Sequence, residues 1–222
     1  MSDLVDAAKK TLLDNRRSGY TLPTNNKLYP AQWNWDSAFI SLGYSYFNLD
    51  YAIEELETLL KGQWDDGMVP HILFHEADDS YFPNHITWSC GKEVPSSGIT
   101  QPPIAASILN IIVKNNQLNK IQNEKVFKLV CKLKKYHEWF FKNRDKNKSG
   151  LVSIIHPWES GYDNSPLWDF ALSKITIDQN LSYERRDLKV SNNDERPLNK
   201  DYDCYITLLN QFKSEKYNPN KI

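Results

Sequence analysis

The sequence predicts an all-α fold built from antiparallel pairs of helices. Apolar residues recur every three or four positions in several segments, which is the spacing of the buried face of a helix. No segment shows the clear alternation of apolar and polar residues that a half-buried strand would have. Glycine and proline separate the helical segments, as they do where helices end and begin. These observations favour helices packed on helices and argue against a sheet.

Three helices are predicted in the first part of the chain. The apolar face of the first begins at Leu4, and this helix ends near Gly19. The second covers residues 35–47, and the third begins at Asp50. Gly62 follows the last apolar residue of the third helix and favours its end there, because glycine readily closes a helix.

Four further helices are predicted in the rest of the chain. Pro103 suits the first position of the fourth helix, since that position needs no backbone N–H. The fifth, over residues 124–143, has the most regular apolar face, which consists of Val126, Leu129, Val130, Leu133, Tyr136, Trp139 and Phe140. A short sixth helix starts near Pro166, and a seventh covers residues 201–213. The connection over residues 64–100 is long for a compact domain, and its Trp, His and Asp residues favour a functional role.

Charge and composition exclude several classes of protein. The 222 residues fit one domain, and 27 basic against 28 acidic residues give a net charge of -1. Basic residues are therefore not in excess, as they usually are in proteins that bind nucleic acid or an anionic membrane surface, so neither is expected as a partner. The longest apolar run, residues 104–113, is too short to cross a bilayer. The first residues lack the basic and apolar regions of a secretory signal, so a cytoplasmic protein is expected.

Neither a metal nor a cofactor is expected. The three cysteines, Cys90, Cys131 and Cys204, are odd in number and lack CxxC spacing, so we interpret them as free thiols. The histidines and acids show no convincing ligand spacing, and no glycine-rich phosphate loop occurs. Residues 145–150 resemble the start of a calcium loop, but His156 stands where that loop needs a bidentate Glu, so a turn is predicted.

Four polar segments, most of them rich in aromatic residues, lie between the predicted helices. They cover residues 29–37, 62–71, 96–103 and 156–166. The last holds an imidazole, two carboxylates, aromatic rings and a glycine, and it shows no hydrophobic period. Aromatic faces beside amides and carboxylates suit a sugar, whose C–H face stacks while its hydroxyls form hydrogen bonds. We expect the four segments to form the rim of one pocket.

These segments carry the motifs Tyr-Pro-x-Gln-Trp-x-Trp-Asp-Ser, Gly-x-x-Pro-His, Thr-Gln-Pro-Pro and His-Pro-Trp-Glu-Ser-Gly-x-Asp-Asn-Ser-Pro. In this order, from about residue 20 to about residue 170, the sequence resembles the mannosylglycerate and glucosylglycerate hydrolases of glycoside hydrolase family 63. The resemblance implies an (α/α)6 toroid and hydrolysis of an α-glycoside with inversion. The family's domain is about twice this length and has its general base, a Glu, in the second half. The expected fold is therefore the N-terminal half of the toroid, an incomplete barrel of helical hairpins.

The resemblance places the general acid at Asp163. Trp158, Tyr162 and Trp168 could desolvate its carboxyl group and raise its pKa. The alternative is that Asp163 caps the short helix that follows it. Glu159 lies too close to Asp163 in the chain for the two to face opposite sides of a sugar ring, as an acid and nucleophile about 5–5.5 Å apart must. We therefore interpret Glu159 as a supporting residue of the site.

The substrate site is expected to be lined by residues of the same motifs. By resemblance these are Tyr29, Gln32, Trp33, Trp35, Asp36, His71, Gln101, Trp158 and Glu159. Asp36, beside two indoles, is expected to bind sugar hydroxyls, and the alternative is that it caps the second helix. Gln101 and His71 are either pocket residues or loop residues with local hydrogen bonds.

The chain is expected to divide at residue 174. Residues 1–174 would form the N-terminal part of the hydrolase domain, and residues 175–222 a polar connector, one further helix and a tail. Residues 178–200 are dense in Asn, Asp, Glu and Arg, which favours an exposed or disordered segment.

Three hypotheses for function follow. The first is an inverting hydrolase of a small α-glycoside, such as mannosylglycerate or glucosylglycerate, whose other half and base come from a second chain. The second is a non-catalytic carbohydrate-binding remnant. The third is an interaction module whose apolar face drives association with a partner or with itself. Glu184, Glu195 and Glu215 lie outside the matched motifs, so no base is identified and the chain alone is expected to be inactive or incomplete.

Overall fold

The computed structural model describes residues 2–24 and 28–221, without the side chain of Ser2, and over these residues the fold is mainly helical. The helices are α1 (Ser2–Asn15), α2 (Asn34–Ser45), α3 (Leu49–Lys61), α4 (His85–Trp88), α5 (Ala105–Asn115), α6 (Lys120–Arg144), α7 (Asp169–Leu172) and α8 (Asn199–Ser214). Short 3₁₀ turns cover Pro157–Ser160, Pro166–Trp168, Asp187–Lys189 and Asn193–Glu195. The two strands are β1 (Gln32–Trp33) and β2 (Ile72–Leu73). The prediction of an all-α fold is confirmed.

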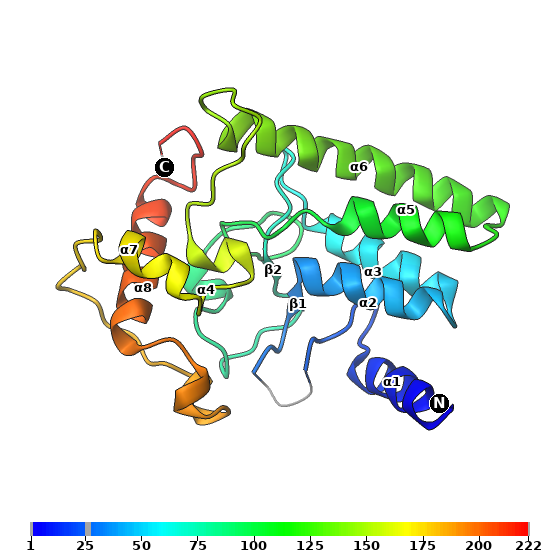
Figure 1. Cartoon of the computed structure of the whole chain (residues 1–222), viewed down its shortest axis with the longest axis horizontal. Coiled ribbons are helices and arrows are strands. Elements are labelled where there is room, and N and C mark those ends of the chain that lie inside the picture. Colours follow the sequence, from blue (N-terminus) through cyan, green and yellow to red (C-terminus); the bar gives the residue numbers. More distant parts are fainter. Residues whose placement is uncertain (1, 25–27, 222) are drawn as a thin grey trace.

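Two helical hairpins form the body of the molecule. Helix α2 packs against α3 and against α5, while α6 packs against α3 and α5, so the pairs α2–α3 and α5–α6 lie side by side (Figure 1). Leu56, Leu59, Ile112, Tyr136 and Trp139 belong to the apolar core that joins them. Helix α1 packs on α2 at the outside of this body. This arrangement is the predicted incomplete toroid of helical hairpins.

The ends of the hairpin helices follow from local chemistry. Asn48 caps α3 by accepting a hydrogen bond from the Tyr51 backbone N–H (3.1 Å). Helix α6 begins at Lys120, four positions before the predicted start, because Asn119 and Gln122 form a reciprocal capping box. Helix α5 begins at Ala105 and not at Pro103.

The two short strands correct the prediction that the chain has no strand. They pair antiparallel, with Gln32 opposite Leu73 and Trp33 opposite Ile72. Two residues are too few to show an alternating pattern in the sequence. The pair fastens residues 29–37 to the long connection of residues 64–100, which places two of the polar segments next to each other.

The region after α6 forms a second body of loops and short helices around α8 (Figure 1). Leu209 and Phe212 of α8 pack with Trp88. Tyr202 and Tyr205 form part of a further apolar cluster with residues of the connector, which is the segment of residues 175–198 before α8. Residues 178–200 are mostly exposed or half-buried, in line with the predicted exposed segment, but they also hold the buried ion pair of Arg185 with Asp187. The division of the chain at residue 174 stays a prediction.

None of the helices over residues 2–24 and 28–221 has both the length and the apolar character needed to cross a membrane.

Candidate active site

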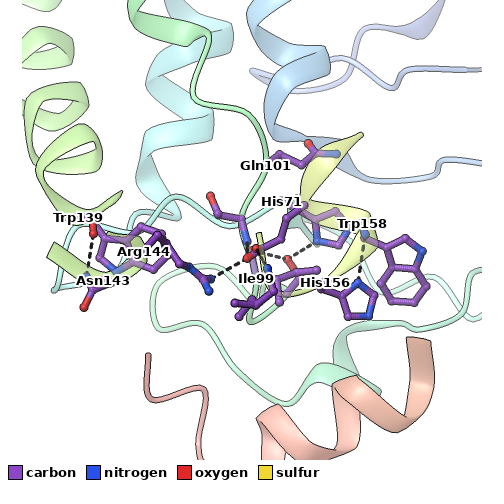
Figure 2. Close-up of polar contacts among 12 residues, drawn as sticks. His71, Ile99, Gln101, Trp139, Asn143, Arg144, His156 and Trp158 are labelled. Atoms are coloured by element: carbon purple, nitrogen blue, oxygen red, sulfur yellow. Dashed lines mark hydrogen bonds and ion pairs between the residues drawn. The ribbon is translucent and has the colours of Figure 1, made fainter. Parts of the chain in front are cut away.

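The four polar segments meet at one pocket of about 210 Å³. Its lining consists of Pro23, Tyr29, Trp33, Trp35, Asp36, His71, Tyr81, Gln101, Trp158, Gly161, Asp163 and Arg196. All of the predicted site residues except Gln32 and Glu159 are in this set. The expected convergence of the four segments is therefore observed, and Figure 2 shows Gln101, His71 and Trp158 coming together from three of them.

The first wall of the pocket is the N-terminal end of α2. Trp33 is the N-cap residue and Asp36 lies in the first turn, so the alternative that Asp36 caps the helix is not observed. The Trp35 backbone N–H donates to Oε1 of Gln101 (3.1 Å), which ties the segment of residues 96–103 to this helix end. Burial raises the pKa of Asp36 to about 6, so its carboxyl group titrates close to neutrality.

The segment that carries Asp163 is shaped by His156 and Gly161. A 3₁₀ turn starts after His156, whose Nδ1 accepts from the Trp158 backbone N–H (3.1 Å). Gly161 follows with φ of 66°, and a Cβ atom there would lie 2.5 Å from Cζ2 of Trp35. Only glycine fits this combination of left-handed backbone and close ring contact.

Asp163 is held at the pocket by its backbone. The Tyr205 hydroxyl donates to the carbonyl oxygen of Asp163 (2.8 Å). Ser165, and not Asp163, caps the turn at Pro166–Trp168, so the alternative role for Asp163 is not observed. Burial raises the pKa of the Asp163 carboxyl group, while Arg196 in the same pocket acts to lower it. The carboxyl group thus retains its proton to a higher pH than an exposed Asp does.

The second wall is a stack of rings around Trp158. The His71 ring lies parallel to the Trp158 ring at 6.3 Å between centroids, and the His156 ring lies 4.6 Å from it. Nδ1 of His71 is hydrogen-bonded to Oγ of Ser97 (2.8 Å). Burial lowers the pKa of His71 well below its ordinary value and that of His156 to about 4, so both imidazoles are neutral. The stack presents an aromatic, uncharged surface to the pocket.

Glu159, which was predicted to line the substrate site, does not line this pocket. It is 4% exposed and pairs with Arg144 at 2.7 Å. Its carboxylate also accepts from the backbone N–H groups of Thr100 (3.2 Å) and Ile155 (3.1 Å). Glu159 therefore joins the end of α6 to two of the four polar segments.

Gln32 is likewise turned away from the pocket. Successive residues of a strand point to opposite sides, so β1 directs Trp33 to the pocket and Gln32 into the protein. The Gln32 side chain is fully buried, donates to Oε1 of Glu55 (3.0 Å) and pairs with Nε2 of His75 (2.7 Å). Gln32, which was predicted to bind substrate, therefore does not line this pocket.

Four lining residues are not among the predicted site residues: Pro23, Tyr81, Gly161 and Arg196. Tyr81 packs edge-on against Trp33 with 5.4 Å between ring centroids. Arg196 comes from the connector, where it donates to Oδ2 of Asp187 (2.9 Å) and to the Tyr29 hydroxyl (3.2 Å). The aromatic content of the long connection is a signal for Tyr81. Arg196 stands among charged residues that favour a surface loop, and no pattern in the sequence marks it.

The described residues contain no group of three or more His, Cys, Asp and Glu side chains that could hold a metal ion. The pocket instead combines two carboxyl groups of raised pKa, aromatic walls and one guanidinium group. Such a lining can donate a proton to an oxygen atom and can bind a sugar ring and an anion.

Comparison with known proteins identifies the family. Residues 29–222 match the model of the mannosylglycerate hydrolase MGH1-like glycoside hydrolase domain. The chain belongs to this family.

The relatives of this chain include proteins named as mannosylglycerate hydrolase and as glucosylglycerate hydrolase. The chain is 44% identical over 219 residues to mannosylglycerate hydrolase MGH2 of Selaginella moellendorffii, covering 98% of this chain and 45% of that protein. It is 33% identical over 208 residues to the glucosylglycerate hydrolase of Mycolicibacterium hassiacum, covering 88% and 47%. The chain thus spans about half the length of these relatives.

Among solved structures, too, the chain matches about half of a longer protein. The family 63 mannosylglycerate hydrolase of Thermus thermophilus in complex with Tris and D-glycerate superposes with a TM-score of 0.92 at 43% identity. The match covers 98% of this chain and 52% of that one. The same enzyme in complex with glucose gives a TM-score of 0.86. The predicted family and the predicted half of its fold are confirmed.

Proposed function

We propose that this chain carries the acid-bearing half of an inverting α-glycoside hydrolase site, with a small glycoside of glycerate as substrate. The observation that carries the proposal is the shared pocket of Asp163, Asp36 and Arg196 between aromatic walls. Membership of the MGH1-like family supports it, because relatives are named as mannosylglycerate and glucosylglycerate hydrolases.

Asp163 is the proton donor in this proposal. The carboxyl group protonates the glycosidic oxygen as the bond from that oxygen to the anomeric carbon breaks, and glycerate leaves as an alcohol. Burial raises the pKa of Asp163, which keeps the group protonated closer to neutral pH than an exposed Asp. The proton therefore sits on a group that can release it in the transition state.

The sugar ring is bound by the walls of the pocket. The face of Trp158 supplies a stacking surface, and the carboxylate of Asp36 accepts hydrogen bonds from sugar hydroxyls. The neutral His71 imidazole offers a ring nitrogen without adding charge beside the ring.

Arg196 is the anchor for the carboxylate of the leaving group. A guanidinium group forms paired, charge-assisted hydrogen bonds with a carboxylate, and its charge does not depend on pH in the working range. Arg196 and the Tyr29 hydroxyl to which it donates lie on the same pocket as Asp163. The preference for a glycerate glycoside follows from this pairing of acid and cation.

The base that activates water is proposed to come from polypeptide that corresponds to the other half of the relatives. The carboxylates of the described lining are Asp36 and Asp163. Glu184 lies elsewhere, in surface ion pairs with Arg186 and Lys189. The same observation favours the second candidate function, a module that binds sugar without turnover.

The test combines binding and turnover. We expect calorimetry to detect binding of glucose or mannose to the 222-residue chain, and turnover of α-mannosylglycerate to be negligible, because loss of a general base costs roughly 10²–10⁴-fold. Adding the polypeptide that corresponds to the relatives' other half should restore turnover, and Asp163→Asn should abolish it. Binding that is never converted to turnover would favour the non-catalytic module. Rapid hydrolysis by the chain alone that survives Asp163→Asn would refute the assignment of the acid.

A further inference from the structure

A buried cluster of three charged side chains lies in the connector before α8. The Asp187 side chain is 5% exposed and accepts from Nε (3.1 Å) and an Nη atom (2.7 Å) of Arg185. The same carboxylate accepts from Nε of Arg196 at 2.9 Å. Two guanidinium groups thus share one carboxylate inside the protein.

Arg185 does not reach the pocket, because its remaining donors are used elsewhere. One of its Nη atoms donates to the carbonyl oxygen of Pro197 (2.7 Å) and to Oδ1 of Asn199 (3.0 Å). The guanidinium carbon lies 4.4 Å from the centre of the Tyr202 ring. Arg185 is therefore held by α8 and the connector, and of the three charged residues Arg196 alone lines the pocket.

The charge balance of the cluster leaves a cation at the pocket. Burial alone would raise the pKa of Asp187, but the hydrogen bonds from Arg185 and Arg196 outweigh it and hold that pKa below its ordinary value. Asp187 therefore stays ionised, and one negative charge faces two positive ones. The remaining positive charge is presented through Arg196.

The orientation of the Arg196 guanidinium group affects how tightly it binds a carboxylate, because the long side chain has many rotamers. A guanidinium group that is already oriented loses less conformational entropy when it binds a carboxylate. The fork of Arg185 fixes both oxygens of Asp187, and Asp187 in turn fixes Nε of Arg196.

We propose that Arg185 is a positioning residue that, through Asp187, orients Arg196 and so sets the preference for substrates whose leaving group carries a carboxylate. This inference rests on the proposed function, since it assigns the determinant of its selectivity. A lysine at position 185 would keep the charge but could not hold both Asp187 oxygens and the Pro197 carbonyl together.

The experiment compares Arg185→Lys with Arg186→Lys. Arg186 is the neighbouring arginine, is in a surface ion pair with Glu184 and provides the matched control. Two readouts are taken on the folded chain: the exchange protection of the Arg196 Nε–H in ¹⁵N NMR, and the dissociation constants of D-glycerate and of glucose. The first readout needs no ligand.

In Arg185→Lys we expect the protection of the Arg196 Nε–H to be lost and D-glycerate to bind about tenfold more weakly. Glucose should bind within about twofold of the unmodified chain, because its walls are unchanged. Arg186→Lys should alter neither readout.

Several results would overturn the inference. Retained protection in Arg185→Lys would show that Arg185 does not position Arg196, and lost protection with unchanged D-glycerate affinity would show that the position has no bearing on selectivity. A chain that binds glucose but not D-glycerate would refute both the anion anchor and its positioning. A chain that binds neither ligand would instead refute the proposed function itself.

Discussion

Replacing Glu55 by Gln is expected to stabilise the protein above neutral pH. Glu55 is fully buried on α3, where Oε1 accepts from Oγ of Ser37 (2.7 Å) and from Nε2 of Gln32 (3.0 Å). Among the described residues, Oε2 has no hydrogen-bond partner. A buried carboxylate in this setting is costly, and burial raises the pKa of Glu55 to about 7.

The size of the effect follows from the two pKa values of Glu55. The folded protein holds the proton more tightly than the unfolded chain, whose carboxyl group has the ordinary pKa of 4.5. The free energy of unfolding is therefore highest below about pH 4.5, falls as the pH rises and levels off above about pH 7. A difference of roughly 2.5 pH units at 1.36 kcal/mol each corresponds to about 3 kcal/mol. Gln has no charge to bury, so Glu55→Gln should remove this loss.

The assay is urea unfolding at pH 5 and pH 8. Glu55→Gln should gain about 3 kcal/mol over the unmodified chain at pH 8 and much less at pH 5. Glu57→Gln is the control on the same helix, because Glu57 forms a half-exposed ion pair with Lys125 (2.8 Å) and its loss should cost about 1 kcal/mol or less. Equal pH slopes for Glu55→Gln and the unmodified chain would refute the reasoning.

Three further perturbations test the pocket and the contacts that support it. Gly161→Ala forces a side chain into a left-handed backbone against Trp35, so we expect a loss of about 1–3 kcal/mol in urea unfolding and weaker glucose binding, and an unchanged midpoint would contradict this. Arg144→Met leaves Glu159 buried without its cation and should cost about 3–5 kcal/mol, part of which Glu159→Gln should restore in the double variant. Because the pKa of Asp36 is about 6, its carboxylate gains a proton as the pH is lowered from 8 to 5, and the affinity for glucose should fall. The glucose affinity of Asp36→Asn should not change over this pH range.

The part of the site that the sequence predicted is the part made of local motifs. Trp33, Trp35 and Asp36 stand together at one helix end, and Asp163 follows a turn whose glycine is visible in the sequence. Gln32 belongs to the same motif, yet a two-residue strand turned it inward, and a strand that short has no signature.

The contribution of the connector could not be predicted. Each of its charged residues, considered alone, is expected to face solvent, whereas in the structure Arg185 and Arg196 share the carboxylate of Asp187 inside the protein. Pairing of this kind depends on distances in space and not on spacing in the chain. Helices α3 and α6, by contrast, were predictable because each buries apolar residues that repeat at helical spacing.

The hydrogen bond from Arg196 to Tyr29 joins positions 167 residues apart and has a consequence for how the site forms. The two hairpins depend on contacts that are nearer in sequence, so their helices can form before the connector is in place. Native-state hydrogen exchange should therefore find the connector opening at a lower free energy than α3 and α6. In such partly opened molecules the helical body persists while the cation is withdrawn from the pocket. Selectivity for an anionic ligand should then disappear at a lower urea concentration than the helical signal does.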